Sequence, residues 1–281
     1  MTIRRVLATG DHQCGSFFGL WPDGFKENYK LNKLQEYLWA CWLDQCTHMP
    51  ILDTLVLMGE GIDGNNHKAD GDAITENSLA LQASAFLLCI KPLLAKVRDG
   101  GRVYVMRSSP YHSGPAARAD QEIGERLDLL SQNAGWILKR DLIGRACQSW
   151  VHMEEDGVNF DLAHHRSAAQ VNRSMPLERE GRYNDSVSDL LQGGADDVII
   201  RAHSHVGITV NEGYRWFIGL PPWKFEDDFV MAGAVPNRTV TRFIGSTLIE
   251  TDGEAKRAGK EPVVGIRKFW YRHPIIPRDS A

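Results

Sequence analysis

The stretch Val198-Ile199-Ile200-Arg201-Ala202-His203-Ser204-His205-Val206 joins a run of β-branched apolar residues to two histidines one residue apart. Such a run predicts a buried strand, and alternation along a strand sends His203 and His205 to the same side. Two imidazoles that point the same way can bind a metal ion. The alternative is a pair of structural histidines, because an isolated His-x-His motif has low specificity.

Other strand-like runs in the chain also end in residues that can bind metals. These residues are Asp11 with Gln13, Glu60, Ser109 with His112, and His164 with His165. Open α/β sheets bind their ligands just beyond the carboxyl ends of the strands, so we expect all these motifs at one edge. Carboxylates and imidazoles from several loops suit a two-metal site, in which a carboxylate bridges ions roughly 3.5–4 Å apart and the ions hold a phosphoryl group.

The order of the predicted elements indicates an α/β (α+β) fold. Strands at about 3–9, 54–58 and 102–106 alternate with helices at about 27–47, 72–97 and 116–130, and Gly100-Gly101 is read as a turn. Strands then follow one another, at about 136–139, 149–153, 158–162, 198–205, 207–210, 214–219, 239–250 and 263–271, with a short helix at about 185–192. This change predicts two packed, mixed β-sheets flanked by helices. No repeat and no linker interrupts the chain, so we expect one domain over residues 1–281.

Composition sets limits on the partners and the compartment. The 281 residues are 43% hydrophobic and 24% charged, which supports a packed core, and the net charge is -4. A nucleic-acid contact would therefore need a local basic patch. Five cysteines without a CxxC spacing indicate reduced, buried thiols in an intracellular protein. The N-terminus lacks a signal peptide and no apolar stretch reaches the length of a membrane span, so we expect a cytoplasmic protein with no membrane partner.

Five motifs together resemble those of a known family. They are Asp11-His12-Gln13, Gly59-Glu60-Gly61-Ile62-Asp63, Ser108-Ser109-Pro110-Tyr111-His112, His164-His165 and Ala202-His203-Ser204-His205. In this order they resemble the calcineurin-like metallophosphoesterases, in particular a variety common in bacteriophage genomes. The resemblance spans nearly the whole chain, from the residues after Asp11 to Leu220-Pro221-Pro222-Trp223-Lys224 and Phe243-Ile244-Gly245. It implies a four-layer sandwich and a metal-dependent phosphodiesterase or nuclease that acts on nucleic acid or nucleotides.

The resemblance also implies a role for each site residue. The first metal would be held by Asp11, Gln13, Glu60 and His205, and the second by Glu60, Ser109, His164 and His203. His164 is preferred to His165, because the first histidine of such a pair is the usual ligand in the family. His112 would protonate the leaving oxygen or stabilise the developing charge, and Asp63, Arg107 and Arg166 are candidates for substrate contact. One or two divalent ions are expected, manganese first, with iron, zinc or magnesium as alternatives.

Four residues depart from the family pattern, and one of them is Ser108, which replaces a glycine. Gln13 stands where the family has a histidine, Glu60 where it has the bridging aspartate, and Ser109 where it has asparagine or threonine. These changes predict a metal site that is weakened, altered in preference or lost. The second hypothesis is therefore a binding or regulatory module without turnover, and the third is a structural phage component. The sequence leaves open the oligomeric state, and whether the segment 166–182 is a lid or a partner surface.

Overall fold

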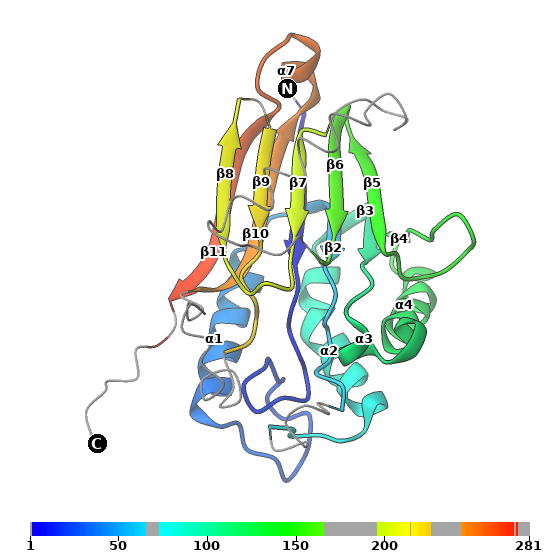
Figure 1. The fold of residues 1–281 in the computed structure, drawn as a ribbon, viewed down its shortest axis with the longest axis vertical. Coiled ribbons are helices and arrows are strands. Elements are labelled where there is room, and N and C mark those ends of the chain that lie inside the picture. The colour runs from blue at the N-terminus through cyan, green and yellow to red at the C-terminus, as the bar shows by residue number, and fades with distance from the viewer. Residues whose placement is uncertain are drawn as a thin grey trace.

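The structure is a computed structural model that describes residues 2–65, 73–165, 196–213, 215–225, 243–272 and 274. Two β-sheets pack against each other (Figure 1). The first sheet has the order β11 (Val263–Arg272), β10 (Phe243–Asp252), β1 (Ile3–Thr9), β2 (Leu52–Leu57), β3 (Val97–Val105), β4 (Ile137–Leu138). The second has the order β5 (Trp150–Glu155), β6 (Val158–Ala163), β7 (Val198–Arg201), β9 (Arg215–Gly219), β8 (Ile208–Glu212).

Both sheets are mixed. Strands β1 to β4 are parallel, and β10 and β11 extend the same sheet in antiparallel pairing. In the second sheet β6, β7 and β9 are parallel, while β5 and β8 form antiparallel edges. Parallel strands of this kind are covered on both faces, which is why every residue of β2 is buried. The carboxyl ends of β1, β2, β6 and β7 carry four of the five motifs.

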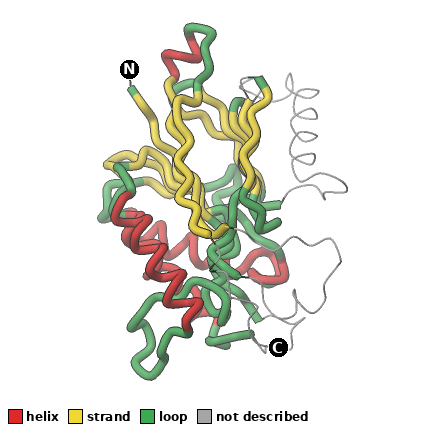
Figure 2. Tube along the Cα trace, turned by 90° about the vertical axis from the view of Figure 1, so that its left-hand side faces the viewer, coloured by secondary structure: helices red, strands yellow, loops and turns green. Residues whose placement is uncertain are grey.

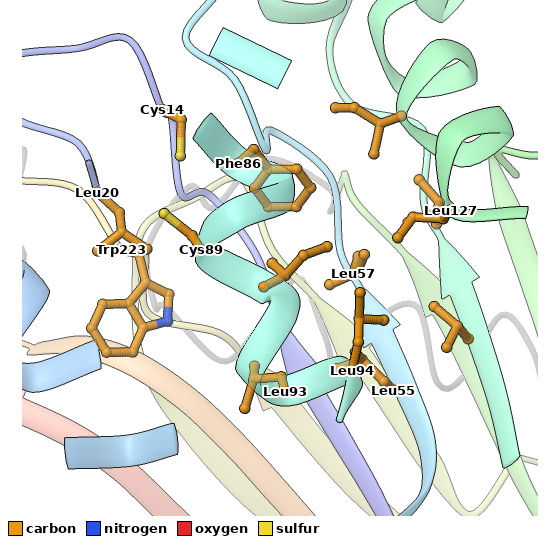
Figure 3. Packing of buried hydrophobic residues seen from close by; sticks show 14 of the residues in the cluster. Cys14, Leu20, Leu55, Leu57, Phe86, Cys89, Leu93, Leu94, Leu127 and Trp223 are labelled. Carbon is orange, nitrogen blue, oxygen red and sulfur yellow. The ribbon is translucent and has the colours of Figure 1, made fainter. Parts of the chain in front are cut away.

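Three helices cover the outer face of the first sheet: α1 (Lys33–His48), α2 (Leu79–Leu94) and α4 (Arg118–Ser131). Figure 2 shows the sheets as two layers of strands with these helices to one side. Phe86 and Cys89 of α2 pack toward Leu55 and Leu57 of β2, and Trp223 belongs to the same hydrophobic cluster (Figure 3). The shorter helical elements are α3 (Pro110–Ser113), η2 (Pro115–Ala117) and α7 (Gly253–Arg257).

A second core fills the space between the two sheets. Strand β1 contributes to both cores, because Leu7 faces the helices while Val6 and Ala8 face the second sheet. Across from them lie Phe160 and Ile200 from β6 and β7. This alternation follows from the two-residue period of a strand. The predicted architecture of two mixed sheets flanked by helices is confirmed.

The boundaries of several elements differ from those predicted. The helix expected over 27–47 begins at Lys33, because Asn32 caps it: Asn32 Oδ1 accepts the N–H groups of Leu34 and Gln35. The helix expected over 72–97 spans Leu79–Leu94, with Ser78 as its cap. The turn expected at Gly100-Gly101 lies inside β3, where the pairing with β2 shifts register. The predicted helix at 185–192 and the segment 166–182 lie outside the described residues.

Among the described residues, every helix is too short or too polar to cross a membrane. All five cysteines are free and buried, as predicted: Cys14, Cys41, Cys46, Cys89 and Cys147.

Candidate metal centre

The loops that follow β1 and β2 run side by side. The backbone N–H of Asp11 donates to the carbonyl of Gly59 at 3.0 Å, and that of Gln13 donates to the carbonyl of Glu60 at 2.9 Å. Because β1 and β2 are parallel neighbours, their carboxyl ends lie at one edge, and these hydrogen bonds continue the pairing beyond the strands. Asp11, Gln13 and Glu60 are thereby held together.

One carboxylate oxygen of Glu60, Oε1, faces three side chains from three other loops. It lies 3.0 Å from His164 Nε2, 3.1 Å from His203 Nδ1 and 2.9 Å from Ser109 Oγ. The two imidazole nitrogens are 3.2 Å apart. Ligands around one metal ion, with bonds of about 2.1 Å, lie roughly 3.0 Å apart in an octahedron and 3.4 Å apart in a tetrahedron. The spacing around Oε1 therefore fits a metal-ligand set as well as it fits hydrogen bonds.

The other oxygen, Glu60 Oε2, faces a different group of side chains. It accepts a hydrogen bond from Gln13 Nε2 at 2.8 Å, and it lies 3.5 Å from His112 Nε2 and 4.0 Å from His205 Nε2. Asp11 lies close to Glu60 and His164 as well, since these three residues offer ligand atoms within 4.8 Å of one another. Glu60 is thus placed as a bridge between two groups of donors.

The ring of His164 is fixed by a backbone contact. Its Nδ1 lies 2.6 Å from the carbonyl oxygen of Met58 and donates a proton to it. In the neutral ring Nε2 then carries a lone pair directed at Glu60 Oε1. Two acceptors this close need a proton or a metal ion between them. Metal-binding histidines usually donate their other ring N–H to a carbonyl or carboxylate, as His164 Nδ1 does to Met58.

Burial and neighbouring charges shift the pKa values of Asp11 and Glu60 in opposite directions. Burial raises the pKa of Asp11 to about 7, His164 opposes the change, and Glu60 adds to it. Asp11 Oδ1 is buried without a hydrogen-bond partner. Burial also acts to raise the pKa of Glu60, but His112, His164 and His203 outweigh it and hold that pKa well below its usual range. A divalent cation would compensate the charge of both carboxylates.

His112 lies beside Glu60 and is oriented by the backbone carbonyl of Asp63. Its Nδ1 donates to the carbonyl of Asp63 at 2.7 Å, so Nε2 is turned toward Glu60. The Asp63 carboxylate is fully buried and lies 3.5 Å from the ammonium of Lys224, itself 8% exposed. Lys224 was not among the site residues predicted from sequence. Nothing in the local pattern around Pro222-Trp223 marks it as a partner of Asp63, which is 161 residues away.

Much of the site has an unusual backbone conformation. Asp11, Gln13, Glu60, His203 and His205 all have positive φ, between 44° and 63°. This left-handed region costs a residue other than glycine about 1 kcal/mol or more, and such strain persists where the surrounding structure enforces it, often at functional sites.

The sequence analysis placed His203 and His205 on a strand, and this prediction is wrong. Strand β7 ends at Arg201, and His203 and His205 follow it on a loop. They approach different oxygens of Glu60, Oε1 at 3.1 Å and Oε2 at 4.0 Å. The N–H of His203 also donates to Asp11 Oδ2 at 3.1 Å, so the first and last motifs are in contact.

The remaining predicted residues are placed less closely. The charge of Arg107 acts to lower the pKa of the Cys147 thiol, which burial raises to about 11. In the described part of the chain no hydrogen bond or ion pair joins the Arg107 guanidinium to the candidate ligands. Arg166 lies outside the described residues. A second residue missed from sequence is Asp120 of α4, whose Oδ2 accepts the N–H and the hydroxyl of Ser108 and so fixes the turn that carries Ser109.

No protein-family model and no curated protein matches this sequence. Similar solved structures include Vps29 from Entamoeba histolytica complexed with Zn²⁺, at 11% identity over 95% of this chain and 98% of that chain, with a TM-score of 0.43. A novel archaeal phosphodiesterase has 12% identity over 95% and 99%, with a TM-score of 0.42. YfcE, a phosphoesterase from E. coli, has 9% identity over 94% and 99%, with a TM-score of 0.36. Identities this low say nothing about activity, so the function has to be argued from the site.

Proposed function

We propose that this protein is a metal-dependent phosphoesterase, and more narrowly a phosphodiesterase or nuclease that acts on nucleic acid or nucleotides through two metal ions. The observation that supports this most is the division of the Glu60 carboxylate. Oε1 faces His164, His203 and Ser109, while Oε2 faces Gln13 and His205. These are the two ligand groups that the sequence resemblance implies for the second and the first metal.

The residues present fit divalent ions. Asp11 Oδ1 and Gln13 Oε1 are buried oxygens without hydrogen bonds, which a bound cation would satisfy. When bound, a pair of divalent ions would polarise the phosphoryl oxygens and lower the pKa of an attacking water. Manganese is the ion we expect first, because the donors are a mixture of carboxylate, amide and imidazole groups.

His112 is the residue proposed to move a proton. Its Nδ1 hydrogen is committed to the carbonyl of Asp63, so only Nε2 can exchange a proton with a substrate. Nε2 lies 3.5 Å from Glu60 Oε2, at the border of the site, where it could protonate the leaving oxygen. The carbonyl of Asp63 holds the His112 ring in this orientation.

A second candidate function is a binding module that no longer turns over substrate. The observation in its favour is that Gln13 donates its amide N–H to Glu60 Oε2, the oxygen that would face the first metal. A protein whose first site is closed by this hydrogen bond could bind one ion and a phosphate group without the second ion that hydrolysis needs. The leading proposal also includes three points argued from the sequence: the protein is a phage-type member, it works in a host cytoplasm and it consists of one domain.

The test is hydrolysis of bis(4-nitrophenyl) phosphate in manganese, together with calorimetric titration of the metal. We expect Glu60→Gln to lose both metal binding and hydrolysis. His112→Ala should keep metal binding and lose rate by roughly 10²-fold or more, the usual contribution of a general acid. His48→Ala, an exposed histidine at the end of α1, is the matched control and should change neither. Metal binding without hydrolysis in the parent protein favours the binding module, and no metal binding overturns both.

A further inference from the structure

A third histidine adjoins the group around Glu60 Oε1. His165 lies with its ring centroid 4.4 Å from that of His203 and 4.9 Å from that of His164. Each of the three histidines offers a ring nitrogen within 4.8 Å of the others. His165 and His203 are exposed while His164 is buried, so the group opens from the protein interior to the surface.

Adjacent residues on a strand point to opposite faces, so His164 and His165 would not meet if β6 continued. Strand β6 ends at Ala163, and the chain bends at His164. The carbonyl of His164 then accepts the N–H of Ala202 at 3.0 Å, which ties this bend to the segment that leads to His203. The bend at His164 and its hydrogen bond to Ala202 therefore bring the three histidine rings together.

Ser109 is a weak candidate for the remaining ligand of the second metal. Its hydroxyl already donates to Glu60 Oε1 at 2.9 Å, and a neutral hydroxyl is a poor ligand compared with imidazole. Without Ser109, the second site has Glu60 Oε1, His164 Nε2 and His203 Nδ1. A nitrogen from His165 would bring this set to four.

We propose that His165 is a ligand of the second metal and that, with His164 and His203, it makes this site a three-imidazole centre selective for zinc. The inference rests on the proposed function, because it concerns the same pair of metals. Three nitrogens and one carboxylate oxygen form a set that zinc accepts in tetrahedral geometry, while manganese and magnesium prefer oxygen ligands.

The first site differs in its donors. Asp11, Glu60 Oε2 and Gln13 offer oxygens, and His205 offers the single imidazole. Harder ions such as manganese or magnesium suit this group. The bridging carboxylate would thus separate an oxygen-rich site from a nitrogen-rich one, and the two sites would differ in metal preference.

The test uses the full-length protein, stripped of metal by a chelator and titrated separately with zinc and with manganese by calorimetry. The variant His165→Ala is compared with the parent and with His48→Ala, the exposed histidine of α1. We expect His165→Ala to weaken zinc binding by at least about tenfold and manganese binding much less, so that the zinc preference falls. Cobalt(II) adds a readout that does not depend on activity: its intense visible absorption in a four-coordinate site should fade in His165→Ala.

Three results decide the inference. Unchanged zinc affinity and an unchanged cobalt spectrum in His165→Ala overturn it, and they leave the proposed function standing if Glu60→Gln still abolishes binding. Equal losses for zinc and manganese overturn the zinc selectivity. A parent protein that binds neither metal overturns the inference and the proposed function together.

Discussion

The side-chain amide nitrogen of Gln13 donates a hydrogen bond of 2.8 Å to Oε2 of Glu60. The amide oxygen, Oε1, is buried without a hydrogen bond. For Gln13 to bind the first metal, the amide must turn so that its oxygen replaces its nitrogen near Glu60, and this hydrogen bond is then lost. Metal binding through Gln13 at the first site therefore competes with an internal hydrogen bond to Glu60, as metal binding through Ser109 does at the second site.

Replacing Gln13 with histidine should strengthen the first site. An imidazole gives a lone pair without breaking a donor contact to Glu60, and histidine tolerates the positive φ of 44° at this position better than most residues. We expect Gln13→His to raise manganese affinity by about tenfold or more in a calorimetric titration. Gln132→His, at the exposed end of α4, is the control and should change nothing. An unchanged affinity in Gln13→His would mean that residue 13 is no ligand.

Gly59 allows His164 to approach the site. It has a φ of 92°, and a Cβ built there would lie 2.8 Å from His164 Nδ1. We expect Gly59→Ala to destabilise the protein in urea unfolding and to weaken metal binding, because the methyl group displaces the ring. Gly144→Ala isolates the backbone effect, since Gly144 has a φ of 84° and nothing within 4 Å. It should cost about 1 kcal/mol and leave metal binding intact. Equal effects of the two variants on metal binding would argue against crowding at His164.

Lys224 should stabilise the buried carboxylate of Asp63. Removing one member of a buried ion pair leaves the other charge uncompensated, which typically costs about 3 kcal/mol or more. We expect Lys224→Met to lose stability of this order in urea unfolding. The control is Lys256→Met, since Lys256 pairs with Asp197 near the surface and such pairs contribute about 1 kcal/mol or less. Adding Asp63→Asn to Lys224→Met should recover part of the loss, and no recovery would show that the ion pair is not its cause.

His152 should make stability depend on pH. Its Nδ1 lies 3.1 Å from Asp196 Oδ1, and although burial acts to lower the pKa of His152, the Asp196 carboxylate outweighs burial and raises this pKa above its ordinary value. A raised pKa in the folded state stabilises the protein fully below the unfolded pKa, and this contribution is lost as pH rises through the folded value. We therefore expect His152→Gln to destabilise the protein more at about pH 5.5 than at about pH 9 in chemical unfolding. His48→Gln, at an exposed histidine, should show a smaller difference in the free energy of unfolding between the two pH values. A loss of stability in His152→Gln that grows with pH would refute the pairing of His152 with Asp196.

The sequence predicted where the strands lie along the chain and that the candidate metal-binding residues follow their ends, because both depend on local features. A run of β-branched residues identified β7 and an apolar run identified β2, and the polar residues that follow each run marked where the strands stop. The helix boundaries were less well predicted, since the caps at Asn32 and Ser78 determine where α1 and α2 begin.

By itself, the sequence determined that Asp11, Glu60, His164 and the two histidines of the Ala202-His203-Ser204-His205 motif follow strand ends and so belong to one edge of the sheets. Only the tertiary structure decided how they meet. The alternation rule holds on an extended strand, but His203 and His205 lie beyond β7 in left-handed conformations. Those conformations are enforced by contacts between loops distant in the chain, such as the hydrogen bond from His203 to Asp11. No local pattern specifies such contacts, and for the same physical reason the division of Glu60 between two donor groups and the position of Lys224 emerged only from the fold.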